Sequence, residues 1–190
     1  TLRNSGIQIP IVSGAFCPAI FSTGVYHGNM PVQDDIEFTR NVISQFLENG
    51  LLDSADALSF HSYERPGSIA ACTSTLRNVI QQSERRNIPI WITEAGYCWD
   101  GKSGMRATIS NDIDCAKVIA AKALEAKAAG ITRFYTFVMN HYTENTVNNA
   151  IDSFGLIDGY FTPQRSFCAY ATAARKFAHY QYVGELSNIQ

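Results

Sequence analysis

Four short apolar runs, each followed by a longer segment with helical periodicity, constrain the fold of this chain more than any other feature. The apolar runs cover residues 9–14, 55–60, 88–93 and 132–138. The segments with helical periodicity cover residues 34–49, 68–87, 111–129 and 166–180. Apolar runs of this length are typical of strands that are buried on both faces of a parallel sheet. The order βαβαβαβα therefore predicts an α/β fold with a parallel sheet.

The connections differ in length at the two ends of the predicted strands. Long segments rich in glycine, aromatic and polar residues follow the strands, at residues 16–31, 61–68, 95–110 and 140–163. The turns that lead into the next strand are short. This asymmetry is typical of a TIM barrel, whose active site is built from the loops at the carboxyl ends of its strands. A doubly wound sheet shares the asymmetry and stays open as an alternative.

Composition excludes several classes of function. Only 17% of the 190 residues are charged and the net charge is −2, so the sequence has no basic surface for nucleic acid. No apolar run approaches the roughly 20 residues that cross a bilayer, which argues against a membrane protein. The five cysteines form no CxxC pair and no histidine stands at metal-ligand spacing, so no metal site is predicted. No glycine-rich phosphate motif follows a predicted strand, and no nucleotide cofactor is expected.

Glu94 is the sharpest candidate for chemistry, because it is a carboxylate at the end of an otherwise apolar strand and is followed by Ala95 and Gly96. The period of two along a strand places Glu94 on the same face as Ile90 and Ile92. If these two residues fill the interior of a barrel, Glu94 projects from its open mouth. The alternative is a carboxylate that caps the next turn.

Two further groups of polar and aromatic residues end neighbouring predicted strands. His61 and Tyr63 are two residues apart, so they share a face and are expected beside Glu94, where they can donate hydrogen bonds to its carboxylate. Phe137 can stack on the apolar face of a sugar, and Asn140 and His141 can bind its hydroxyl groups. In each case the alternative is an ordinary core side chain.

These motifs together resemble the second half of a clan of retaining glycoside hydrolases with (β/α)8 barrels, the clan of cellulases, endo-mannanases and β-xylosidases. In that clan a His-x-Tyr closes the sixth strand, a Glu followed by a small residue and Gly closes the seventh, and aromatics end the eighth. Here these are His61-Ser62-Tyr63, Glu94-Ala95-Gly96 and residues 134–137, followed by a segment beginning SFGLIDG at Ser153 and a final helix.

The resemblance implies that residues 1–190 form a single partial domain, strands 5–8 of a TIM barrel, whose N-terminal half is absent. It implies a glycosidase that cleaves O-glycosyl bonds of a plant or microbial polysaccharide or oligosaccharide without a cofactor. Glu94 is then the nucleophile and Tyr63 and His61 are its catalytic partners. The residues expected to bind the sugar are Tyr97, Trp99, Phe137, Asn140 and His141.

Two departures from the clan limit this expectation. The general acid/base of the clan is a Glu that follows an Asn on the fourth strand, and this sequence contains no Asn-Glu dipeptide. Phe137 stands where the clan often has a Trp. We therefore expect the isolated chain to be inactive and a complementing N-terminal half-barrel to be its partner. The alternative is a non-catalytic half-barrel that binds carbohydrate or assembles with another chain. An extracellular location is expected, because glycan polymers lie outside the cell.

Overall fold

The computed structural model describes residues 5–6, 9–16, 41–81, 83–84, 87–100, 104–145 and 151–184. Four strands in this part form one parallel sheet in the sequential order β1-β2-β3-β5. They are β1 (Val12–Phe16), β2 (Ala57–Ser62), β3 (Ile90–Ala95) and β5 (Arg133–Thr136). Each strand overlaps one of the four apolar runs, so the predicted parallel α/β sheet is confirmed. The predicted loop after β1 and the start of the helix predicted at residue 34 lie outside the described residues.

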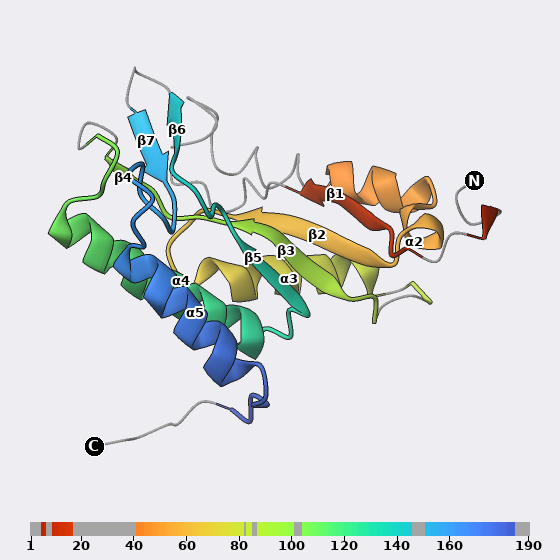
Figure 1. Ribbon diagram of the computed structural model, residues 1–190. Coiled ribbons are helices and arrows are strands. Elements are labelled where there is room, and N and C mark those ends of the chain that lie inside the picture. Colours follow the sequence, from red (N-terminus) through yellow and green to blue (C-terminus); the bar gives the residue numbers. More distant parts are fainter. Residues whose placement is uncertain are drawn as a thin grey trace.

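Helices follow the strands in the predicted order. Residues 41–48 are helical, and the named helices are α2 (Leu51–Ser54), α3 (Ser68–Ile80), α4 (Ile109–Ala128) and α5 (Arg165–Phe177). Thr108 caps α4, because its side chain accepts a hydrogen bond from the N–H of Asn111. In Figure 1, α3, α4 and α5 lie together along one side of the sheet, as helices do outside a barrel. None of the helices in the described ranges is long and apolar enough to span a bilayer.

The largest hydrophobic core lies between the sheet and the helices. Ile90 and Ile92 of β3 have no exposed surface and belong to one buried cluster with Ile69 and Leu76 of α3. Their side chains therefore face the helix layer. The expectation that Ile90 and Ile92 fill the barrel interior is wrong, because alternation along a strand identifies two faces without telling which of them the helices cover.

A β-bulge in β3 places Glu94 on the face opposite Ile90 and Ile92. Phe60 of β2 pairs with Ile92, but the next residue of β2, His61, pairs with Glu94, so Thr93 is an extra residue in β3. One extra residue shifts the alternation of side chains by one position. Glu94 therefore lies on the face of His61, at the carboxyl end of the sheet, where the sequence analysis expected the active site.

The segments after β3 and β5 contain a second, smaller sheet that the sequence analysis treated as loop. Its strands are β4 (Trp99–Asp100), β6 (Tyr142–Asn145) and β7 (Ile151–Phe154), arranged antiparallel in the order β4-β7-β6. Figure 1 shows this sheet beyond the carboxyl ends of β3 and β5. Strands of two to four residues are too short for a period-two pattern to stand out in the sequence.

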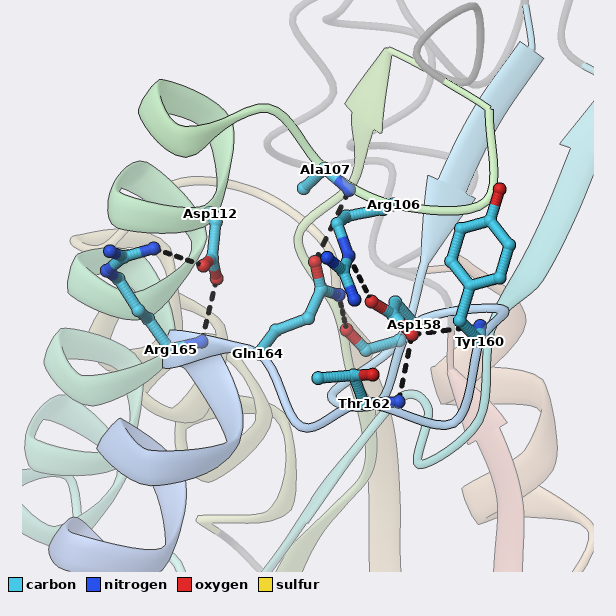
Figure 2. Close-up of polar contacts among 9 residues, drawn as sticks. Arg106, Ala107, Asp112, Asp158, Tyr160, Thr162, Gln164 and Arg165 are labelled. Carbon is cyan, nitrogen blue, oxygen red and sulfur yellow. Dashed lines mark hydrogen bonds and ion pairs between the residues drawn. The ribbon is translucent and has the colours of Figure 1, made fainter.

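A buried carboxylate fixes the turn between β7 and α5. Asp158 accepts hydrogen bonds from the N–H groups of Tyr160 and Thr162, both at 2.9 Å, and from Arg106 (Figure 2). Burial alone would raise the pKa of Asp158, but these hydrogen bonds and the Arg106 charge lower it below its ordinary value. Beside this turn, Asp112 of α4 accepts two hydrogen bonds from Arg165, so the first turns of α4 and α5 are joined (Figure 2).

Candidate active site

The structure brings Glu94, Tyr63 and His61 together at the carboxyl end of the sheet. The Tyr63 hydroxyl donates a hydrogen bond to Glu94 Oε2, and His61 Nδ1 lies 3.3 Å from the same oxygen. The Glu94 side chain keeps 35% of its surface exposed, so a ligand can reach it. Among the described residues no hydrogen bond to Oε1 is found. Tyr63 and His61 thus orient one oxygen of the carboxylate, and no described residue binds the other.

Tyr63 is held in place by aromatic rings and by a glycine. Its ring meets Phe137 and Phe154 edge to face, with a centroid separation of 5.8 Å in each pair. A Cβ added at Gly96 would lie 2.7 Å from Cε1 of Tyr63 and 3.2 Å from the carbonyl oxygen of Phe137. Only glycine permits this approach, so the Gly of the Glu-Ala-Gly motif makes room for the phenol that contacts Glu94.

The structure buries Trp99 and engages Tyr97 in polar contacts of its own. Trp99, on β4, has 3% of its surface exposed, so it presents no open ring to a sugar. The Tyr97 hydroxyl donates to Asp114 at 3.1 Å, and the Arg65 guanidinium lies 5.0 Å from the centre of its ring. Burial and the bond to Asp114 raise the pKa of Tyr97 to about 12. Sugar binding by these two side chains stays a prediction, and in this arrangement Tyr97 is the more accessible of the two.

Phe137, Asn140 and His141 lie in the segment that connects β5 to β6. Phe137 contacts Tyr63 and also packs edge to face on Tyr142, which is exposed, and the Phe137–Val138 peptide bond is cis. Asn140 is exposed. The ring of His141 lies 6.0 Å from Trp99, and its buried Nε2 has no partner among the described residues. The structure thus places Phe137 beside the Glu94 site, whereas His141 belongs to the packing around Trp99.

Two residues near the site were missed by the sequence analysis. Trp91 pairs with Ser59 on the face that also carries His61, and its partly exposed ring lies 6.4 Å from that of Tyr135. Lys122 of α4 is completely buried beneath the site. Its position could have been found, because Val118, Lys122 and Ala126 recur every four residues, as the buried face of a helix does.

No candidate cation site includes Glu94 in the described part of the chain, and a groove lies on the other side of the sheet. Within these residues, no group of three or more His, Cys, Asp and Glu side chains could hold a metal ion. An open groove of about 490 Å³ lies between α4, β5 and α5, where Phe134, Tyr170 and several alanines line it. This groove is on the helix side of the sheet, and Glu94 is not among its lining residues.

Comparison with known proteins finds similarity of fold. No protein-family model and no curated protein matches the sequence. Among solved structures, a family 39 glycoside hydrolase from the gut symbiont Bacteroides cellulosilyticus matches with a TM-score of 0.50 and 18% identity, over 77% of this chain and 32% of that one. Xylanase 10B from Thermotoga maritima matches with a TM-score of 0.47 and 13% identity, over 77% of this chain and 44% of that one.

A β-xylosidase from Caulobacter crescentus matches with a TM-score of 0.43 and 16% identity, over 67% of this chain and 28% of that one. The chain spans less than half the length of each of these three structures. The match to the family 39 enzyme agrees with the sequential parallel sheet and its outer helices. The expected resemblance to (β/α)8-barrel glycoside hydrolases is therefore confirmed for the fold, and the chain has the fold of part of such a barrel.

Proposed function

We propose that this chain carries the nucleophile of a retaining glycoside hydrolase and that Glu94 is this nucleophile. The observation that supports the proposal is the convergence of Tyr63 and His61 on one oxygen of a partly exposed carboxylate at the carboxyl end of a parallel sheet. In folds of this class, reactive groups gather at this end of the strands. The hydrogen bond from Tyr63 fixes the direction of the carboxylate.

The proposed reaction begins with attack of Glu94 Oε1 on the anomeric carbon of a sugar. A bond forms between this oxygen and the sugar, and the bond to the leaving oxygen breaks with its electron pair. Tyr63 and His61 hold Oε2 while the carboxylate loses its charge to the new ester. Water later hydrolyses the glycosyl ester and releases the sugar with retained configuration.

The acid/base group of this reaction must come from outside the motifs found here. A retaining enzyme places its second carboxyl about 5 to 5.5 Å from the first. The clan takes this group from an Asn-Glu pair, which the sequence lacks. We propose that a complementing N-terminal half-barrel supplies it, and that the complete site acts on polysaccharides or oligosaccharides outside the cell.

The proposal can be tested by trapping the glycosyl ester. An activated glycoside with a dinitrophenyl leaving group needs no proton donor, and a fluorine at C2 of the sugar slows hydrolysis of the ester, so the adduct accumulates. We expect one glycosyl adduct per chain from a panel of 2-fluoro glucosyl, mannosyl and xylosyl reagents, read by intact mass and located on Glu94 by peptide mapping. Glu94→Gln should abolish labelling, and Glu48→Gln, at an exposed position, should leave it unchanged.

Two results would overturn the assignment. An adduct on another carboxylate, or labelling that persists in Glu94→Gln, would mean that Glu94 is not the nucleophile. Oligosaccharide binding detected by NMR without labelling by any reagent of the panel would favour the alternative, a non-catalytic carbohydrate-binding half-barrel.

A further inference from the structure

Lys122 lies in the middle of α4, has no exposed surface, and reaches the sheet from below the candidate site. Its Nζ donates hydrogen bonds to the carbonyl oxygens of Ser62, at 2.9 Å, and Gly96, at 2.8 Å. Ser62 directly precedes Tyr63, and Gly96 follows Glu94 by two residues. We propose that Lys122 is a positioning residue that sets the geometry of the Tyr63–Glu94 pair. The inference rests on the proposed function of Glu94.

The two residues whose carbonyls bind Lys122 are also joined directly to each other by a backbone hydrogen bond. The N–H of Gly96 donates to the carbonyl of Ser62 at 3.1 Å, so the Ser62 oxygen accepts from both Gly96 and Lys122. We call this arrangement of Lys122 Nζ with the carbonyls of Ser62 and Gly96 the lysine clamp. The clamp ties the ends of β2 and β3 to each other and to α4, at the point where the backbone leads into Tyr63 and out of Glu94.

The next turn of α4 holds the other end of the same loop. Glu125 accepts hydrogen bonds from the N–H groups of Gly67, at 2.8 Å, and Ala70, at 2.9 Å, at the start of α3. Residues 62–67 are therefore fixed to α4 at both ends. Lys122 binds the carbonyl at one end, and Glu125 binds N–H groups at the other. Tyr63 lies in this segment, so movement of its phenol relative to Glu94 is restricted from both sides.

A buried ammonium is a costly way to fill space in a helix-to-sheet core. Burial lowers the pKa of Lys122 to about 8, although the negative charges of Glu64 and Glu125 act in the opposite direction. Within the described residues no carboxylate lies within ion-pair distance of Nζ. A methionine would occupy a similar volume without the desolvation cost. Compared with a methionine, the lysine therefore contributes hydrogen-bond donors at this position and not better packing.

The test compares Lys122→Met with Lys117→Met, a matched change at an exposed lysine of the same helix. Labelling kinetics with the 2-fluoro glycoside separate binding, as the inhibition constant, from attack by Glu94, as the maximal rate of inactivation. Lys122→Met should lower the inactivation rate roughly 10- to 100-fold and change the inhibition constant less than about twofold, because a misplaced nucleophile affects the bond-forming step. Lys117→Met should match the wild type in both constants.

Hydrogen–deuterium exchange supplies a readout that does not depend on activity. In Lys122→Met, faster exchange should be confined to residues 61–67 and 94–98, with α5 unchanged. Lys122→Gln, which keeps one donor group, should give intermediate values in both measurements and serves if the Met variant does not fold.

Each remaining outcome counts against the inference. A wild-type inactivation rate in Lys122→Met, or faster exchange spread evenly over the chain, would show that the lysine does not position the pair. Failure of both variants to fold would show a purely structural role and would also overturn it. If the wild-type protein itself is not labelled, the proposed function fails and the inference falls with it, a result distinct from labelling that is indifferent to Lys122.

Discussion

At the scale of single residues, the arrangement around Glu94 depends on the absence of a side chain at position 96. The ring of Tyr63 lies against the backbone of Gly96, and its hydroxyl contacts Glu94, which lies two residues before that glycine. The backbone of Gly96 also makes two hydrogen bonds next to the site. Its carbonyl accepts from Lys122, and its N–H donates to the carbonyl of Ser62. A substitution at Gly96 therefore affects Glu94 indirectly, through the position of Tyr63.

Gly96→Ala is expected to push the Tyr63 ring away and to loosen its bond to Glu94. Overpacking of this kind costs about 1 to 3 kcal/mol of folding stability, and we expect the rate of labelling at Glu94 to fall at least about tenfold because the carboxylate loses its orientation. Thermal unfolding and labelling kinetics measure the two effects. Gly14→Ala is the control, since a Cβ there meets no described atom within 4 Å. Equal effects of the two substitutions would contradict the steric explanation.

Tyr63→Phe separates the hydroxyl from the ring. The variant keeps the edge-to-face contacts with Phe137 and Phe154 and loses the hydrogen bond to Glu94. A hydrogen bond to a charged group contributes about 1.5 to 3 kcal/mol, so we expect the labelling rate to fall roughly 10- to 100-fold. Tyr142→Phe, at an exposed tyrosine of β6, is the matched control. A labelling rate equal to that of the wild type would remove Tyr63 from the proposed mechanism.

Sequence reasoning was most successful for residues whose roles follow from a short motif. Glu94, His61 and Tyr63 end adjacent parallel strands, and the carboxyl ends of such strands meet at one edge, so their proximity could be predicted. Trp99 could not be placed in this way, because its burial depends on pairing with Ser153, more than fifty residues away. Within the described residues, the hydrogen bonds of Lys122 go to backbone carbonyls, and no pattern of side chains in a sequence records such a bond.

At the scale of elements, the turn between β7 and α5 is held by side-chain hydrogen bonds that add to its backbone pairing, which includes the antiparallel bridge between Ile157 and Pro163. Asp158 satisfies the N–H groups of Tyr160 and Thr162, and Gln164 joins the same segment to Gly155 through a hydrogen bond of 2.9 Å (Figure 2). The sequence analysis singled out this segment by its motif, and the structure gives a physical role for its aspartate. Its polar contacts connect the end of the small sheet to the first turn of α5.

Asp158→Asn is expected to lower the melting temperature at neutral pH, because the bond to Arg106 loses its charge. The pKa of Asp158 is lower in the folded protein than in the unfolded chain, so its contribution is present above the ordinary Asp pKa of about 3.9 and is lost as the pH falls through the folded value. The difference between wild type and variant should therefore shrink below about pH 4. Thermal unfolding from pH 2 to 7 measures it, with Asp53→Asn, at an exposed position, as control. A difference that stays constant with pH would contradict the charge-based account.

The three longest helices were predictable because each carries a periodic pattern and its own end signals, and the parallel strands because each overlaps an apolar run. The four-residue helix α2, which follows Gly50, was not predicted. Gly130 lies just after the end of α4 and has a positive φ of 73°, which is typical of a glycine that ends a helix. The small sheet and the bulge at Thr93 were not predictable, since they arise from pairing between distant segments. The correct placement of Glu94 at the open edge came from the motif, while the face assigned to Ile90 and Ile92 was wrong.

At the scale of the whole molecule, the proposed site is a nucleophile without its acid/base partner. The sheet presents His61, Glu94 and Trp91 on the face away from the helices, and the sequence has no Asn-Glu pair to complete the reaction. General acid assistance is typically worth a factor of about 10² to 10⁴ in rate. The acidity of the leaving group therefore determines which substrates this chain can cleave without a proton donor.

We expect the isolated chain to show little or no hydrolysis of natural oligosaccharides and slow turnover of a dinitrophenyl glycoside. The natural alkoxide must be protonated as it leaves, whereas a dinitrophenolate leaves without help. Joining the chain to an N-terminal half-barrel that carries the acid/base group should restore cleavage of the natural substrate. Both activities should be lost in Glu94→Ala. Efficient cleavage of a natural oligosaccharide by the isolated chain, or activity indifferent to Glu94, would show that the wrong carboxylate or the wrong family has been assigned.

The extra residue in β3 has a consequence for insertions and deletions. The side chain of Ile92 packs against the helix layer and that of Glu94 lies on the opposite face of the sheet. Thr93 is the single residue between them. Deleting Thr93 would leave the chemical composition of the edge almost unchanged, yet it would turn the carboxylate into the helix layer or force the whole strand to slide. A sequence alignment that opens a gap between these two positions would then match glutamates that point in opposite directions. The spacing of Ile92 and Glu94 is thus as much a part of the site as the carboxylate itself.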